Sequence, residues 1–322
     1  MKSVLFIFII IPALALATWN YEGKWGSYGG GNGQFYLAES AAINAVTGYV
    51  YVVDANQNRV QYFTWNGSFL GRWGSYGAGD GQFSNPRCAA FQSGTGYIYV
   101  TDAYNDRVQW FTGNGTFAGK FGSGGTGDGQ FNMPAGICFA PATGYLYVVD
   151  YDNHRVQYFT PAGSFLGKWG SFGNAAGQFN RPWGVAVSPT SGNVYVTDVL
   201  NYRVQYFTPS GSFLGMWGSQ GSGDGQFNGP QGLSFTADGS KVYVADRLNA
   251  RIQYFTPAGS FLGKFGSSGV RDGQFRNPYD VDFTPAGDRL YVVESVNCRV
   301  QYFRAYTTVT PASLGRIKAL FR

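Results

Sequence analysis

The chain has few of the side chains that enzymes most often use for proton transfer and metal binding. Its 322 residues include one histidine, His154, and three cysteines, Cys88, Cys138 and Cys298. One histidine and three scattered cysteines do not make a typical zinc site, and no second histidine is available as the relay for a serine nucleophile. We therefore expect no metal, no cofactor and no catalytic residue of these kinds, which leaves a carboxylate mechanism as the open route to catalysis.

Charge is also scarce, at 13% of residues. Residues 18–303 contain 18 basic and 18 acidic side chains, so this part of the chain is formally neutral. A neutral body lacks the positive surface that a phosphate backbone requires, and we expect no nucleic-acid partner. The basic excess lies outside it, in Lys2, Arg304, Arg316, Lys318 and Arg322.

Long apolar runs are missing except at the N-terminus. Lys2 precedes an apolar stretch over residues 4–11, and small residues follow at Ala15 and Ala17. This order predicts a secretory signal peptide over residues 1–17, with an uncleaved membrane anchor as the alternative. We expect a secreted, extracellular protein without a transmembrane segment after cleavage, consisting of a folded domain over 18–304 and a short basic tail over 305–322.

Glycine and aromatic residues are abundant, and they recur with a fixed period. An acidic residue returns every 48 residues, as do an aromatic-Gly-Ser run and a Gln-Phe pair. Six copies without an insertion indicate one supersecondary unit repeated six times. The acidic positions are Asp54, Asp102, Asp150, Asp198, Asp246 and Glu294.

Each unit predicts four short antiparallel strands. In the fourth unit these cover residues 185–187, 194–197, 203–207 and 212–217, separated by Gly, Pro, Asn and Asp turns. The sixth unit lacks its last strand, and residues 20–26 align with residues 68–74 one period later. The sequence therefore predicts an all-β, six-bladed β-propeller of four-stranded antiparallel blades, with the last blade closed by the N-terminal strand.

The repeat resembles the NHL repeat. Pro182 and Gly184 match its first strand, and the segment after Tyr195 matches its Asp-x-x-Asn-x-Arg core through Asp198, Asn201 and Arg203. The first unit departs from the pattern at Gln57 and the last at Glu294. The resemblance implies a propeller, but the family includes RNA-binding modules, extracellular sensor domains and a peptide-amidating lyase, so it does not imply one function. That lyase needs several histidines for its zinc, which this chain does not have.

Features that repeat in every blade are expected to be architectural. The Asp and Asn side chains of the core motif suit turn amides, and the Arg suits a bridge to a neighbouring acid or carbonyl. The glycine-rich loops lead into strands rather than helices, so they indicate turns and not phosphate-binding loops. Cys88 and Cys138 lie on neighbouring inner strands two residues out of register, which allows either a disulfide or, as for Cys298, a small buried side chain. His154 is expected on a surface loop.

Binding residues are expected where the blades differ. The loops after the fourth and second strands open on one face and carry unlike residues in each blade, with apolar ones gathered on blades four to six. Neutral drift on unused loops is the alternative. The predicted ligand or partner site consists of Glu39, Arg87, Tyr104, Tyr151, Trp183, Leu200, Arg247 and Tyr279.

These patterns favour a binding or interaction scaffold that uses its loop-rich face. Its partner would be an extracellular protein, peptide or glycan. Asn66 and Asn114 lie in Asn-x-Ser/Thr sequons and are predicted to be glycosylated. Two other classes stay open: a hydrolase or lyase with a site in the central pocket, and a structural component of an extracellular coat or matrix.

Overall fold

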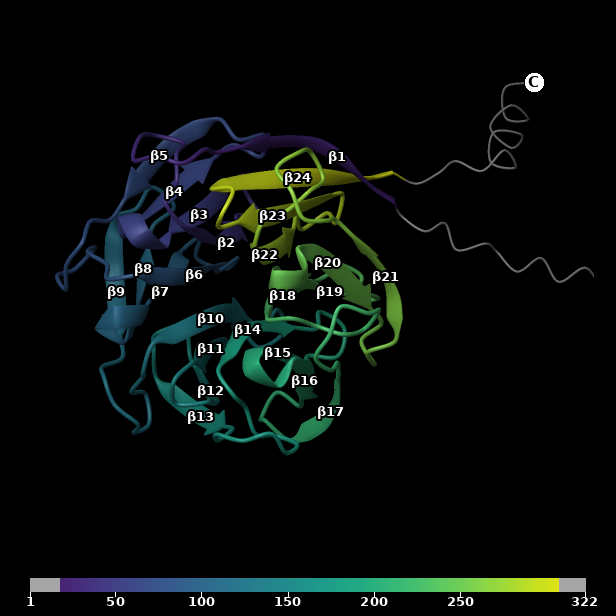
Figure 1. The fold of residues 1–322 in the computed structure, drawn as a ribbon. Coiled ribbons are helices and arrows are strands. Elements are labelled where there is room, and N and C mark those ends of the chain that lie inside the picture. Colours follow the sequence, from purple (N-terminus) through teal and green to yellow (C-terminus); the bar gives the residue numbers. More distant parts are fainter. Residues whose placement is uncertain (1–17, 307–322) are drawn as a thin grey trace, which may run out of the picture.

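A computed structural model describes residues 18–306 as six blades around a central channel (Figure 1). Each blade is an antiparallel sheet of four strands, and the innermost strands face the channel. The six-bladed propeller predicted from the 48-residue period is therefore confirmed. The signal peptide and most of the basic tail predicted from the sequence lie outside the described residues. Among the described residues, no helix is long and apolar enough to cross a membrane.

The first three blades each begin with their innermost strand. Blade one consists of β2 (Ala38–Ile43), β3 (Val50–Asp54), β4 (Arg59–Phe63) and β5 (Phe69–Trp73). Blade two consists of β6 (Pro86–Phe91), β7 (Ile98–Asp102), β8 (Arg107–Phe111) and β9 (Phe117–Phe121). Blade three consists of β10 (Pro134–Phe139), β11 (Leu146–Asp150), β12 (Arg155–Phe159) and β13 (Phe165–Trp169).

The next two blades repeat this order, and short 3-10 helices follow the second strand in four blades. Blade four consists of β14 (Pro182–Val187), β15 (Val194–Asp198), β16 (Arg203–Phe207) and β17 (Phe213–Trp217). Blade five consists of β18 (Pro230–Phe235), β19 (Val242–Asp246), β20 (Arg251–Phe255) and β21 (Phe261–Phe265). The 3-10 helices are η1 (Ala55–Gln57), η2 (Ala103–Asn105), η3 (Val199–Asn201) and η4 (Arg247–Asn249).

The sixth blade joins the two ends of the described chain. Its strands are β22 (Pro278–Phe283), β23 (Arg289–Glu294), β24 (Arg299–Tyr306) and, as the outermost, β1 (Thr18–Trp25). Figure 1 shows the purple β1 lying along the yellow β24. The pairing is antiparallel from Trp19 opposite Ala305 to Trp25 opposite Val300, which confirms closure by the N-terminal strand. Because β1 covers the outer edge of β24, this edge is not left unpaired, and blade six has four strands like the other blades.

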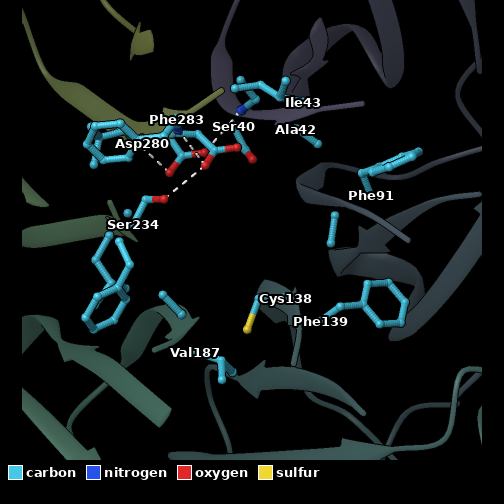
Figure 2. Close-up of a pocket in the computed structure, with 18 of the residues that line it drawn as sticks. Ser40, Ala42, Ile43, Phe91, Cys138, Phe139, Val187, Ser234, Asp280 and Phe283 are labelled. Carbon is cyan, nitrogen blue, oxygen red and sulfur yellow. Dashed lines mark hydrogen bonds between the residues drawn. The ribbon is translucent and has the colours of Figure 1, made fainter. Parts of the chain in front are cut away.

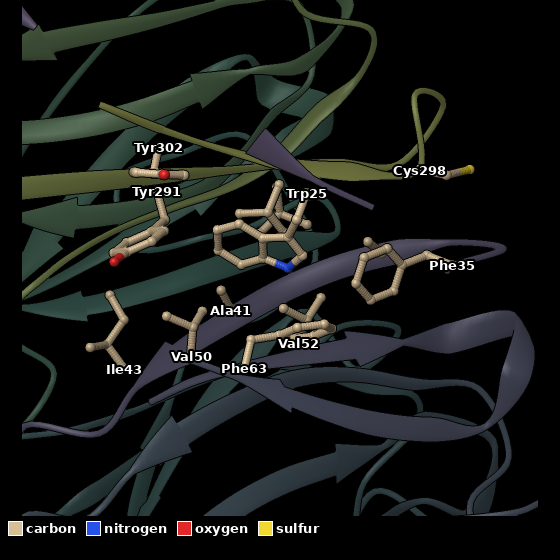
Figure 3. Close-up of a cluster of buried hydrophobic side chains, with 13 residues drawn as sticks. Trp25, Phe35, Ala41, Ile43, Val50, Val52, Phe63, Tyr291, Cys298 and Tyr302 are labelled. Atoms are coloured by element: carbon tan, nitrogen blue, oxygen red, sulfur yellow. The ribbon is translucent and has the colours of Figure 1, made fainter. Parts of the chain in front are cut away.

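The hydrophobic core lies between neighbouring blades. At the seam, Trp25 of β1 packs against Phe63 of blade one and Tyr291 of blade six, with ring centroids 5.6 Å and 5.9 Å away (Figure 3). Equivalent clusters fill the other five junctions. Because one blade cannot bury both of its faces alone, the stability of each blade depends on its neighbours.

The repeated Asp and Arg residues fix the loops between blades. In blade two, buried Asp102 accepts hydrogen bonds from the Ser84 amide at 2.7 Å and from Arg107 Nε at 2.7 Å. Arg107 also donates to the carbonyls of Ala78 and Gln82 in the glycine-rich loop, at 2.7 Å and 2.9 Å. These contacts satisfy turn backbone groups with a charge-assisted network. The architectural interpretation of the repeated motif is confirmed.

Candidate ligand site at the channel mouth

A β-bulge at the start of each inner strand points one side chain toward the end of the channel. In blade two, Pro86 pairs with Asp102, and the next paired residue is Ala89 opposite Val100. Similar register shifts occur in the other five inner strands. A bulge bends the strand and re-aims the extra residue, here the one directly after the strand's first position. Around the ring these residues are Glu39, Arg87, Ala135, Trp183, Gln231 and Tyr279.

Five of these side chains, all except Ala135, and the neighbouring loops enclose a cavity of about 300 Å³ at this end of the channel, the channel mouth. Seven of the eight residues predicted from the sequence line it. Tyr104, the eighth, lies on the blade-two loop outside the cavity and is 60% exposed. We call the polar and aromatic lining the mouth cluster; it consists of Glu39, Arg87, Tyr151, Trp183, Gln231, Arg247 and Tyr279.

Trp183 forms an aromatic floor for this cavity. Its ring meets those of Tyr151 and Tyr279 edge to face, with both centroid distances 5.7 Å. Only 6% of Trp183 is exposed. Trp183 is therefore part of the packed interior, because the bulge turns it inward across the channel. Of the described residues, it alone lines both this cavity and the channel below.

Two arginines are held against the aromatic rings. The guanidinium of Arg87 lies 4.7 Å from the centre of the Trp183 ring and 5.0 Å from that of Tyr151. Arg247 lies 4.7 Å from the centre of the Tyr279 ring. Cation–π contacts of this kind orient a guanidinium while leaving its edge N–H groups free to donate. The mouth therefore contains two guanidinium groups of fixed orientation that can donate hydrogen bonds.

Within residues 18–306, the mouth cluster contains five buried polar atoms without a hydrogen-bond partner. They are Glu39 Oε2, Arg87 Nε and Nη1, Gln231 Oε1 and Arg247 Nε. The other unpartnered atoms in that range are four indole nitrogens, which belong to tryptophans at one repeat position. Glu39, Arg87 and Gln231 are respectively 5%, 8% and 3% exposed. Buried groups of this kind are normally satisfied, so their concentration in one cavity requires an explanation.

The Glu39 carboxyl has a raised pKa because it is buried in this cavity. Burial raises its pKa to about 7, and the nearby charges of Arg87 and Arg247 only partly oppose the shift. Neither arginine forms an ion pair with Glu39 among the described residues. The carboxyl therefore changes charge near neutral pH inside a cavity that holds two cations.

Below Trp183, the channel widens to a cavity of about 540 Å³ lined by all six inner strands (Figure 2). Most of the wall is apolar, but blade six contributes Asp280 and Asp282. Asp280 accepts the Ala41 amide at 3.1 Å, and Asp282 accepts the Ser234 hydroxyl at 3.0 Å. Burial, with the charge of Asp282, raises the pKa of Asp280 to about 7, and burial raises that of Asp282 to about 6.

Sequence reasoning missed this carboxylate pair, although a signal was present. Asp280 occupies the position that is glycine in three blades, and its Oδ1 fills the space beside Gly232 that an added Cβ would need. Asp282 aligns with Ser234 and with small residues in the other blades. Comparing one repeat position across all six blades, rather than searching for motifs, would have found both.

The remaining candidates have structural roles. No group of three or more His, Cys, Asp or Glu side chains able to hold a metal occurs between residues 18 and 306. Cys88, Cys138 and Cys298 are free thiols, so the possible Cys88–Cys138 disulfide is not present. Buried Cys298 packs in the seam cluster. The His154 ring packs 4.9 Å from that of Phe172, and its Nδ1 accepts the Arg181 amide at 3.0 Å.

Six four-stranded blades around a channel closed at one end by unlike side chains define the class of this protein as a six-bladed β-propeller. The NHL repeat family matches residues 131–159 and 179–207, in blades three and four, which confirms the resemblance to the NHL repeat. No curated protein matches its sequence.

Solved structures with the same fold have little sequence in common with this chain. A Xanthomonas campestris gluconolactonase superposes with a TM-score of 0.64 at 13% identity, covering 85% of this chain and 88% of that one. An auxiliary nutrient binding protein from Bacteroides thetaiotaomicron gives 0.65 at 15%, covering 88% and 72%. An inactive virginiamycin B lyase from Staphylococcus aureus with quinupristin gives 0.58 at 14%, covering 86% of each chain. At such identities the likeness concerns the fold alone.

Proposed function

We propose that this protein is a secreted binding propeller that captures a ligand at the channel mouth. The observation that carries the proposal is the set of five unpartnered buried polar atoms facing one cavity. Leaving a buried polar group unsatisfied costs on the order of 1–3 kcal/mol, and a ligand that completes these hydrogen bonds recovers that cost. Export is supported by the apolar segment and small residues over 1–17.

The surroundings of the cavity also favour binding. Leu200 and Leu248 line its edge and are 45% and 54% exposed. Apolar groups around convergent polar atoms are typical of small-molecule and peptide sites. The rigid blades would hold these groups in place before a ligand arrives, which lowers the entropic cost of binding. The natural partner would be an extracellular peptide, glycan, small molecule or protein terminus that reaches into the cavity.

The test is capture of a ligand from the medium in which the protein is secreted. Purified protein is incubated with the small-molecule and peptide fraction, desalted, and examined by native mass spectrometry. We expect an added mass that is lost in Trp183→Ala and in Arg87→Met. The matched control is Tyr104→Ala, which removes a tyrosine on the same face but outside the cavity. Absence of any added mass, or equal loss in the control, would contradict binding at the mouth and leave the structural role in a coat or matrix.

A second candidate function is catalysis by the channel carboxylates. Asp280 and Asp282 have pKa values raised to about 7 and about 6, a range suited to proton transfer near neutral pH. Structures of similar fold include a gluconolactonase and a virginiamycin B lyase. The test is turnover of a panel of lactones and cyclic peptides by the wild type and by Asp280→Asn. Turnover that the substitution abolishes would support this candidate, and no turnover would exclude hydrolysis and elimination on these substrates.

A further inference from the structure

The unpartnered atoms of the mouth cluster specify the chemistry of a ligand. Three of them are donors, namely Arg87 Nε and Nη1 and Arg247 Nε. Two are acceptors, Glu39 Oε2 and Gln231 Oε1. A complementary ligand must therefore offer an acceptor-rich group to the arginines and a hydrogen-bond donor to the Glu39 and Gln231 side. A simple anion such as phosphate meets the first requirement better than the second.

The net charge of the cavity lining indicates the charge of the ligand. Arg87 and Arg247 bring two positive charges and Glu39 at most one negative charge. Arg181, which lies 5.5 Å from the Tyr151 ring, is already paired with Asp152 at 3.3 Å and adds no net charge. The lining therefore has a net charge of at least one positive unit, which a ligand with one negative charge balances. Arginine forks match the planar, two-oxygen geometry of a carboxylate.

The size and shape of the cavity indicate how large the ligand is and which groups it carries besides its polar ones. A volume of about 300 Å³ lies at the lower end of small-molecule pockets. Tyr151 and Tyr279 form aromatic walls above the Trp183 floor, and their edge-to-face contacts with Trp183 hold the three rings in place. Flat or apolar groups of a ligand would pack there, while Trp183 separates the ligand from the channel below.

We propose that the channel mouth binds a small monoanionic carboxylate that also carries a hydroxyl donor, that is, a hydroxy acid. This inference rests on the proposed binding function and names its ligand class. The carboxylate lies between Arg87 and Arg247, and the hydroxyl donates to Glu39 or Gln231. Binding gives partners to the three arginine nitrogens and to one of the two acceptors, without placing a like charge beside either arginine.

Mandelate and two close analogues test the two requirements separately. Mandelate has a carboxylate, a hydroxyl and a ring; mandelamide lacks the charge, and phenylacetate lacks the hydroxyl. By isothermal titration calorimetry at about pH 7.5, we expect mandelate to bind, with each analogue on the order of tenfold weaker because each loses one set of hydrogen bonds. Inorganic phosphate should not displace mandelate. Equal affinity for all three compounds, or displacement by phosphate, would overturn the hydroxy-acid assignment.

Variants connect this selectivity to the named side chains. Arg87→Met should remove the preference for mandelate over mandelamide, and Gln231→Leu should reduce the preference over phenylacetate. Tyr104→Ala should bind as the wild type does, because it lies outside the cavity. Circular dichroism melting confirms that each variant is folded. Unchanged selectivity in both folded cavity variants would show that mandelate binds elsewhere and would overturn the proposal.

The two levels of proposal fail in different ways. If a mass captured from the medium is lost in Trp183→Ala but hydroxy acids neither bind nor compete with it, the binding function stands and the ligand class is wrong. If hydroxy acids do not bind and nothing is captured from the medium, both the ligand class and the proposed binding function are wrong. If the captured ligand is itself displaced by mandelate and not by mandelamide, both hold.

Discussion

The guanidinium of Arg87 lies 4.7 Å from the centre of the Trp183 ring, although the two residues occupy the same repeat position of blades two and four. Identical backbone positions therefore project unlike side chains that meet across the end of the channel. At the positions that build the ring, such as those of Asp102 and Arg107, the blades carry the same or similar residues. At the mouth the sixfold repeat is broken, and five buried polar atoms there lack partners.

Truncating the aromatic floor should affect both stability and binding. Trp183 is almost fully buried, so Trp183→Ala should lower the free energy of unfolding by about 3 kcal/mol, as for other buried large-to-small changes. Tyr279→Ala should lower the affinity for a mouth ligand by roughly 1–3 kcal/mol. Urea unfolding and titration on the same proteins separate the two effects. An unchanged unfolding midpoint for Trp183→Ala would contradict its role as the packed floor.

Removing the N-terminal strand should open the ring. Deletion of residues 18–26 leaves β24 with an unpaired edge and removes Trp25 from the seam cluster. We expect aggregation or loss of cooperative unfolding, since an exposed strand edge is a template for intermolecular pairing. Asn20→Ala, an exposed position on the same strand, is the control and should behave as the wild type. A monomeric deletion variant with an unchanged melting temperature would be incompatible with closure by β1.

The channel carboxylates should make the protein more stable in mild acid. The pKa of Asp280 is raised to about 7 and that of Asp282 to about 6, against an ordinary value of 3.8. A carboxyl whose folded pKa is raised contributes stability that is present below the unfolded pKa and is lost as the pH rises through the folded value. The charge of Asp282 adds to the rise in the pKa of Asp280, whereas hydrogen bonds from the Ala41 amide and Ser40 lower this pKa.

The measurement is the difference in unfolding free energy between the wild type and Asp280→Asn/Asp282→Asn across this range. Between about pH 5 and pH 8, we expect the wild type to lose about 4 kcal/mol more than the double variant, which keeps neutral side chains at both positions. Parallel pH profiles for the two proteins would show that these carboxyls are not buried as the structure places them.

Glycosylation of Asn66 and Asn114 is expected if the protein is exported from a eukaryotic cell. Both side chains are exposed in the turns between the third and fourth strands of blades one and two. These turns lie on the face opposite the channel mouth, so a glycan there should leave mouth binding intact. Intact mass before and after glycosidase treatment of the native protein checks the prediction. An unchanged mass with both asparagines unmodified would count against it.

The ring was predictable because every blade repeats the same local signals. Turn residues, alternating apolar positions and a constant 48-residue spacing all point to one unit, and residues 20–26 match residues 68–74 closely enough to place the closing strand. The network around Asp102 and Arg107 was predictable for the same reason. Small departures, such as β24 reaching Tyr306, concern the ends of strands.

The site could be predicted only in part, from positions at which the blades carry different residues. Comparing equivalent loop positions identified most of the lining, but not that a bulge turns Trp183 inward or that Tyr104 points away from the cavity. Neither the depth of the cavity nor the lack of partners around Glu39 is encoded in a local pattern, because both depend on side chains from several blades meeting in space. Asp280 and Asp282 could have been found from their departure from the small residues at the same repeat positions, but their proximity to Ser40, Ala41 and Ser234 depends on the assembled ring.

A crystal structure of the protein soaked with mandelate would test the central claim most directly. The account predicts density in the cavity above Trp183, with the carboxylate within hydrogen-bonding distance of Arg87 and Arg247 and the hydroxyl facing Glu39 or Gln231. The same soak of Arg87→Met should leave the cavity without the ligand. A cavity that holds only water in the wild type at saturating mandelate, or a ligand bound solely at another surface, would contradict the account.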